Sequence, residues 1–157
     1  MSVTVGENSY VTVVEATAYF AARYGYGAWV AETNKDGALI SAAQILDHYC
    51  EWYGYPVADD QSLAFPRFAI DWEDDGLVPQ EIKDAQCEVA FLIITQGSLN
   101  QRPDDSLEEM KAGSVSMKFK AKAGGNPLTN ALVDSLLLPF GICSGSGSTR
   151  MIPIERC

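Results

Sequence analysis

The sequence offers few side chains that could carry out acid–base or nucleophilic chemistry. His48 is the only histidine, and it falls in the middle of a segment with helical spacing, where a surface or interface position is expected. A nucleophilic serine or cysteine needs a base of this kind within hydrogen-bond reach. The chain contains no nucleophile elbow, phosphate-binding loop or dinucleotide-binding fingerprint. We therefore predict no catalytic residues and expect a protein that is not an enzyme.

One acidic cluster invites comparison with a metal site. Asp71, Glu73, Asp74 and Asp75 surround a tryptophan. The cluster lacks the alternating ligand spacing and the late glutamate of a calcium loop. We therefore predict no metal site here and no cofactor.

The four cysteines, Cys50, Cys87, Cys143 and Cys157, are widely spaced and form no Cys-x-x-Cys pair. A structural zinc site normally uses closer pairs together with histidines. Cys50 and Cys87 fall on apolar faces of predicted helices, where a free cysteine behaves as a small hydrophobe. The sequence favours buried free thiols over disulfides or metal ligands.

Charge is distributed unevenly along the chain. The net charge is −10, made of −14 over residues 1–110 (5 Lys+Arg, 19 Asp+Glu) and +4 over residues 111–157 (6 Lys+Arg, 2 Asp+Glu). An acidic body repels phosphate at long range and is poorly suited to holding nucleic acid. Charges of opposite sign in one chain suit the stacking of acidic on basic surfaces in an assembly, although solvated faces would show the same pattern.

The periodicity predicts a mainly α-helical protein, a small bundle of about four helices. The first helix begins with a capping box formed by Thr12 and Glu15 and runs to about residue 24. The clearest amphipathic helix covers about residues 37–53, with Asp36 as its cap. Two further helices follow proline residues and are expected over about 79–97 and 127–139. Their predicted buried faces are Ile82, Ala85, Val89, Ala90 and Ile93 in the first, and Leu128, Leu132, Leu136 and Leu137 in the second.

A period of two replaces the helical period after residue 114. Val115, Met117 and Phe119 alternate with polar residues, which predicts a half-exposed strand. Residues 107–111 either pair with this strand or form a loop. The polar positions include Lys118 and Lys120, with Lys122 beyond them. Lysines of this kind either guard a sheet edge, the favoured interpretation, or contact single-stranded nucleic acid.

The end of the chain has the composition of an extended arm. We predict a helical domain over residues 1–141, with a β element near 107–122, and a flexible C-terminal arm over 142–157. Residues 144–149 (SGSGST) form a flexible spacer, and an apolar group with flanking arginines follows it. Such an arm either frays or becomes ordered on a partner. Its candidate partner-binding residues are Arg150, Met151, Ile152, Pro153, Ile154 and Arg156.

The helix end WYG at residues 52–54 is followed by the segment QSLAFPR at residues 61–67. Together with the segments described above, this pattern resembles the phage protein family labelled DnaT-like single-stranded DNA-binding, with a layout similar to head–tail adaptor (connector) proteins of long-tailed phages. The likeness covers roughly residues 8–140, and QSLAFPR is its most specific part. Phe65 stands where the family pattern leads us to expect a tryptophan, and it keeps an aromatic side chain there.

The resemblance implies a virion protein, made in the host cytoplasm, that forms a ring of about twelve copies at the head–tail interface. The ring would join the portal protein to neck or stopper proteins on the tail side, and genomic DNA would pass through it without specific binding. No membrane is involved. The alternative is a replication accessory protein that binds single-stranded DNA.

Contact residues follow from this interpretation. The arm would anchor to the portal, with Arg150 and Arg156 pairing to acidic groups. Lys118, Lys120 and Lys122 would meet an acidic neighbour, either the adjacent copy or the next tail protein. The long connection over residues 55–78 would pack on the core through its aromatic residues, with Arg67 against an acidic side chain.

Overall fold

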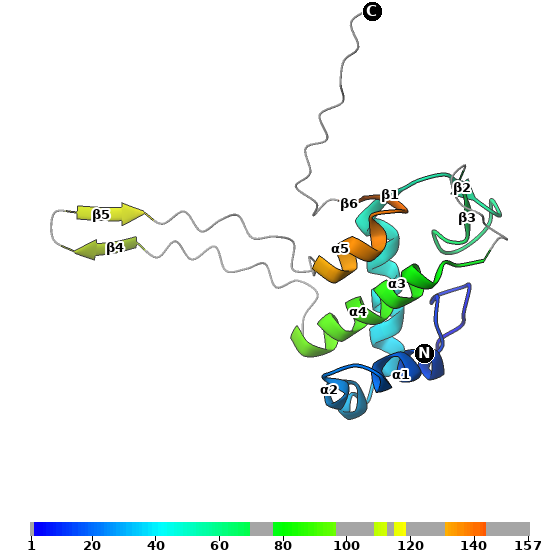
Figure 1. Cartoon of the computed structure of the whole chain (residues 1–157), viewed down its shortest axis with the longest axis horizontal. Coiled ribbons are helices and arrows are strands. Elements are labelled where there is room, and N and C mark those ends of the chain that lie inside the picture. Colours follow the sequence, from blue (N-terminus) through cyan, green and yellow to red (C-terminus); the bar gives the residue numbers. More distant parts are fainter. Residues whose placement is uncertain (1, 70–76, 97–108, 113–114, 119–130, 144–157) are drawn as a thin grey trace, which may run out of the picture.

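The computed structural model is mainly α-helical and describes residues 2–69, 77–96, 109–112, 115–118 and 131–143 (Figure 1). The helices of this part are α1 (Val13–Ala21), α2 (Tyr26–Ala31), α3 (Lys35–Tyr49), α4 (Gln80–Gln96) and α5 (Ala131–Leu137). The strands form three antiparallel pairs: β1 (Cys50–Trp52) with β6 (Gly141–Cys143), β2 (Tyr55–Pro56) with β3 (Arg67–Phe68), and β4 (Glu109–Ala112) with β5 (Val115–Lys118). The predicted helical class with a short hairpin is confirmed.

The capping box predicted at the start of α1 is present. The Thr12 hydroxyl accepts a hydrogen bond from the Glu15 amide at 3.1 Å, and the Glu15 carboxylate accepts one from the Thr12 amide at 2.7 Å. Each bond satisfies a backbone donor that the first turn of a helix leaves open. The helix then buries Ala16 and Phe20 against the rest of the bundle.

The second amphipathic segment forms α3, with boundaries that differ from the prediction. Its N-cap is Asn34, whose side chain accepts from the Gly37 amide at 3.1 Å, so the expected cap at Asp36 is wrong. The preceding α2 was not predicted, because its six residues carry no complete apolar stripe. Its Trp29 is nevertheless fully buried, with its ring centroid 4.7 Å from that of Phe20.

The helix α4 lies at the centre of the bundle and packs against α1, α2, α3 and α5 (Figure 1). It begins one residue after Pro79, as predicted, and ends before Gly97. Its buried face contains Ile82, Ala85, Val89 and Ala90 from the predicted stripe. None of the helices in the described ranges is both long enough and apolar enough to cross a membrane.

The chain leaves the helical conformation after Tyr49, because the residues that follow pair with a distant strand. In the β1–β6 pair, Cys50 lies opposite Cys143 and Trp52 opposite Gly141, and the two cysteines form a disulfide. The expected extension of this helix to residue 53 and the expected free thiol at Cys50 are therefore wrong. Cys87 is a buried free cysteine, as predicted.

The strand predicted after residue 114 is β5, and the segment before it is its partner β4. The register places Glu109 opposite Lys118 and Met110 opposite Met117. This pairing decides between the two alternatives in favour of a hairpin for residues 109–111, the part of the 107–111 segment that the structure describes. The last helix, α5, buries Val133 and Leu137, whereas Leu132, which was expected on the buried face, is 42% exposed.

Candidate interaction surfaces

The cationic side chains of the helical body are held by the body itself. Arg23 forms an ion pair with the buried carboxylate of Glu88, at 2.5 Å, and its guanidinium lies over the Phe91 ring at 4.9 Å. Lys35 donates to the Glu32 carbonyl at 2.6 Å and lies over the Trp29 ring at 5.8 Å. Groups held in this way have little freedom to bind an external phosphate.

Arg67 binds backbone carbonyls. Its guanidinium donates to the carbonyl oxygens of Tyr53 at 2.9 Å, Gly54 at 2.8 Å and Ala64 at 3.3 Å. These contacts replace the acidic partner that we expected, because the tight turn before β2 presents its carbonyl groups to the β3 side chain. Partial burial lowers the pKa of Arg67. The arginine therefore fixes the fold of the connection between α3 and α4.

The β2–β3 hairpin exposes an aromatic surface on a rigid base. Tyr53, Tyr55 and Val57 are 39%, 65% and 39% exposed, and the Tyr55 ring lies 5.7 Å from that of Phe68. We call these four side chains the aromatic hairpin patch. At the turn, Gly54 has φ +71°, and a Cβ there would lie 1.9 Å from the Phe68 carbonyl oxygen. Only glycine fits this close approach.

The interior beneath this hairpin is held by Phe65, the predicted aromatic residue of the connection. Phe65 is 2% exposed, and its ring makes edge contacts with Tyr10, Trp52 and Phe140 at centroid distances of 6.3, 4.9 and 6.1 Å. The expectation that the long connection packs on the core is confirmed for its described residues. The peptide bond between Phe65 and Pro66 is cis.

Two buried polar groups of α4 join distant parts of the chain, and the helical periodicity did not reveal them. Gln86 donates to the Ser9 hydroxyl at 2.7 Å and to the Leu39 carbonyl at 2.8 Å, and it accepts from the Tyr10 amide at 2.9 Å. Glu88 accepts from the Tyr19 hydroxyl at 2.6 Å. Their only sequence signal is that polar residues interrupt an otherwise apolar stripe.

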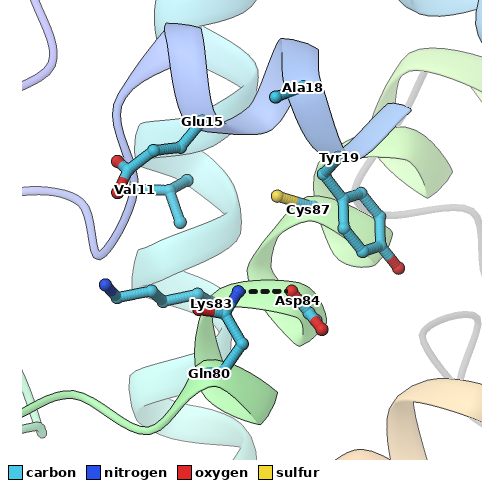
Figure 2. Close-up of a pocket in the computed structure, with 8 residues that line it drawn as sticks. All are labelled: Val11, Glu15, Ala18, Tyr19, Gln80, Lys83, Asp84 and Cys87. Atoms are coloured by element: carbon cyan, nitrogen blue, oxygen red, sulfur yellow. Dashed lines mark hydrogen bonds between the residues drawn. The ribbon is translucent and has the colours of Figure 1, made fainter. Parts of the chain in front are cut away.

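A pocket of about 260 Å³ opens between α1 and α4 (Figure 2). It is lined by Val11, Glu15, Ala18, Tyr19, Gln80, Lys83, Asp84 and Cys87. Burial, with nearby carboxylates, raises the pKa of the Cys87 thiol to about 12, so this cysteine stays protonated at neutral pH and is a poor nucleophile. The Asp84 carboxylate accepts a hydrogen bond from the side-chain amide of Gln80 at 2.8 Å. The lining has acids and a lysine but no activated base.

The side chains considered first for chemistry have ordinary structural positions. His48 is exposed on α3, as expected, and its Nδ1 lies 3.0 Å from the Gln44 carbonyl oxygen. Among the described residues, no group of three or more His, Cys, Asp or Glu side chains could hold a metal ion. The acidic cluster over residues 71–75 lies outside the described residues.

The predicted partner-binding residues fall mostly outside the described part of the chain. Lys118 is the last residue of β5, and the strand register places it opposite Glu109. Lys120, Lys122 and the arm residues Arg150, Met151, Ile152, Pro153, Ile154 and Arg156 lie in ranges that the structure does not describe. The fold therefore fixes the start of the arm, at β6, and not its contacts.

Comparison with known proteins identifies the family. A family model described as "Putative DnaT-like ssDNA binding protein" matches residues 2–157. The chain belongs to this family. No curated protein and no solved structure shows a significant match to the chain. The predicted resemblance to the DnaT-like family is confirmed, whereas the comparisons contain no support for the head–tail adaptor interpretation.

Proposed function

We propose that the protein is a structural subunit of a DNA-handling assembly, a head–tail adaptor of a tailed phage, and that it catalyses no reaction. One observation supports this proposal above the others. Over residues 2–69, 77–96 and 131–143 the chain has 12 Asp+Glu and 4 Lys+Arg, a net charge of −8, and three of these cations are bound to the body's own groups. Such a body repels a phosphate backbone.

The fourth cation of this part, Lys83, lies near an acidic side chain. It lies close enough to Glu15 to lower the pKa of that carboxyl, after the larger effects of the hydrogen bonds from Thr12. An acidic surface suits a channel through which DNA slides without adhering. In the proposed ring, the body would supply this surface, and the basic residues Lys118, Lys120 and Lys122 would contact an acidic neighbour.

The remaining parts of the adaptor proposal concern partners. The arm that follows β6, residues 144–157, would bind the portal protein, neighbouring copies would close the ring, and neck or stopper proteins would bind on the tail side. The protein would then reside in the virion. We infer these partners from the resemblance and from the composition of the arm, and each of them is tested by a separate measurement.

The second candidate is a replication accessory protein that binds single-stranded DNA. The family description favours this candidate over the adaptor. Its binding surface would have to involve the basic residues 111–122, because the described cations of the body are engaged. The four lysines of this range, Lys111, Lys118, Lys120 and Lys122, carry no acidic residue among them.

Binding of a labelled single-stranded oligonucleotide, measured by fluorescence anisotropy over a series of salt concentrations, separates the two candidates. A single-stranded DNA-binding protein binds at low salt and loses affinity with a log–log slope of about −0.7 per neutralised phosphate. The adaptor proposal predicts no binding at ordinary ionic strength. Tight binding there would overturn it.

A deletion tests the arm directly. The chain without residues 144–157 retains every described helix and strand, so we expect it to fold with an unchanged circular dichroism spectrum. Mixed with portal-bearing phage heads, it should fail to co-sediment with them, while the full chain does so. Normal attachment of the truncated chain would contradict the proposed role of the arm.

A further inference from the structure

The aromatic hairpin patch brings three exposed apolar side chains, those of Tyr53, Tyr55 and Val57, into a stretch of five residues around β2. Its members lie on a base that cannot easily rearrange, because Arg67 holds the turn through the Tyr53 and Gly54 carbonyls. Aromatic side chains on a preformed base bind a partner at a small entropic cost. Aromatic residues of this kind are also enriched at the centres of protein interfaces.

The surroundings of the patch determine what can cover it. Glu51, Asp59 and Asp60 are exposed and flank Tyr53–Val57 in the sequence, and we call them the acidic rim of the patch; residues 51–60 contain no lysine or arginine. Arg67, the nearest cation along β3, is occupied by carbonyl groups. A nucleic-acid strand would meet uncompensated acidic groups here. A segment with an apolar centre and basic ends would satisfy both the patch and its acidic rim.

One segment of this chain has that composition. Residues 150–156 read RMIPIER: an arginine at each end, four apolar residues, and Glu155 before the last arginine, with a net charge of +1. We propose that this segment covers the aromatic hairpin patch of its own chain when the protein is free. Ile152 and Ile154 would contact the tyrosine rings, and Arg150 and Arg156 would lie over the acidic rim.

The length of the spacer between Cys143 and Arg150 allows the segment to reach the patch. The Cα atoms of Cys143 and Cys50 are 4.0 Å apart. Tyr55 follows Cys50 by five residues, and since a residue spans at most about 3.6 Å, Tyr55 lies within about 22 Å of Cys143. Arg150 follows Cys143 by seven residues, which span up to about 25 Å. The extended length of the spacer therefore matches this upper bound on the direct distance from Cys143 to Tyr55.

The short tether also favours docking within one chain over docking between chains. A flexible link of a few residues gives an effective concentration in the millimolar range, above the concentration of free protein in most preparations. The disulfide fixes the start of this tether beside β1, the strand that leads into the hairpin. Weak apolar contacts are then sufficient to keep residues 150–156 on the aromatic hairpin patch in a large share of the molecules.

Hydrogen exchange of the full chain tests the proposal. The amides of residues 151–156 other than Pro153, which has none, should exchange at least about tenfold more slowly than in an unstructured peptide. Tyr55→Ser should restore fast exchange. Tyr24→Ser is the matched control, because Tyr24 is fully exposed on the connection between α1 and α2, and it should leave the protection unchanged.

A reciprocal variant tests the same contact from the other side. Ile152→Asp should increase the rate of Tyr55 iodination severalfold and leave that of Tyr24 unchanged. Both substitutions are at surface or terminal positions, and an unaltered melting temperature shows that the fold is intact. Exchange of residues 151–156 at the unstructured rate in the wild-type chain would overturn the proposal.

Dilution separates docking within a chain from docking between chains. Protection that stays constant over a tenfold dilution supports the proposal, and protection that falls on dilution overturns it in favour of a second copy. The inference is independent of the adaptor function, because it concerns the free chain. An adaptor arm would exchange this internal contact for one on its partner.

Discussion

At the scale of single residues, the hydrogen bonds of buried polar groups connect the N-terminal segment to the helices. The Tyr10 hydroxyl donates to the Asp47 carboxylate and accepts from the Phe65 amide at 3.3 Å. Gln86 accepts from the Tyr10 amide. Each of these residues comes from a different part of the chain, so the network fixes the N-terminal segment, α3 and the long connection relative to α4. A buried polar group that loses its hydrogen-bond partner costs free energy. The network therefore favours the one packing arrangement in which all of these groups are paired.

The capping box of α1 permits a stability prediction. Thr12→Ala removes the hydroxyl that accepts from the Glu15 amide, and we expect the free energy of unfolding to fall by about 1 kcal/mol. Thr12→Ser keeps the hydroxyl and serves as the control, with a much smaller change. Urea unfolding followed by circular dichroism measures both variants. Equal stabilities of the alanine and serine variants would contradict the role of the cap.

Asp47 gives a prediction about pH. Burial raises the pKa of this carboxyl above its ordinary value, opposed by the hydrogen bonds from Tyr10 and the Ala64 amide. A carboxyl with a raised folded-state pKa binds its proton more tightly in the folded protein. It therefore contributes stability below its unfolded-state pKa, and that contribution is lost as pH rises through the folded-state pKa.

The corresponding variant is Asp47→Asn, which cannot titrate. The unfolding free energy of the wild-type chain minus that of Asp47→Asn should increase as pH falls from about 7 to about 4. Chemical unfolding at several pH values provides the measurement. Asp60→Asn, a substitution of the same kind at an exposed position, is the control. Parallel curves for wild type and Asp47→Asn would disprove the assignment.

At the scale of elements, the sequence predicted what local interactions determine. The capping box of α1 and the apolar stripe of α4 are local patterns, and both were predicted correctly. The end of α3 at Tyr49 depends on the pairing of β1 with β6, about ninety residues later, and no local pattern reveals that pairing. For the same reason, Cys50 was interpreted as a free thiol, because its apolar helical neighbours gave no sign of Cys143.

The disulfide gives the prediction at this scale. It closes a loop between residues 93 positions apart, and Cys50→Ser should lower the free energy of unfolding by about 2–4 kcal/mol. Adding a reductant to the wild-type chain should produce a similar loss and should leave Cys50→Ser unchanged. Cys157→Ser, which spares the bond, is the control. A wild-type denaturation midpoint insensitive to reductant would contradict the bond in solution.

The candidate interaction residues show the limit of sequence reasoning at this scale. Phe65 was correctly predicted as a buried aromatic residue, since a large apolar side chain in a long connection usually packs on the core. Arg67 was assigned an acidic partner, but its partners are backbone carbonyls that become available only once the turn at Gly54 has formed. The tyrosines of the aromatic hairpin patch were not singled out, because solvent exposure follows from the complete fold.

At the scale of the whole molecule, the charge asymmetry is the property that bears on function. The acidic helical body and the basic residues of the 111–122 range belong to one chain, and opposite charges on separate surfaces favour association between copies or with a partner. Substituting Lys118, Lys120 and Lys122 by Glu should abolish the ring assemblies that the adaptor proposal predicts for the wild-type chain in sedimentation experiments, while leaving the melting temperature nearly unchanged. The triple substitution by Arg keeps the charge and should assemble normally. Assembly by the Glu variant would contradict the proposed contact.

The bond between Cys50 and Cys143 also makes most of the chain a covalent ring. A protease that cuts once anywhere between these two cysteines opens the ring but separates nothing, so the two products migrate together on a gel without reductant. A cut before Cys50 or after Cys143 gives a fragment that separates on that gel. A nick in the β4–β5 hairpin therefore leaves both products joined by a covalent bond, whereas a nick in the N-terminal helices or in the arm leaves no covalent link between its products.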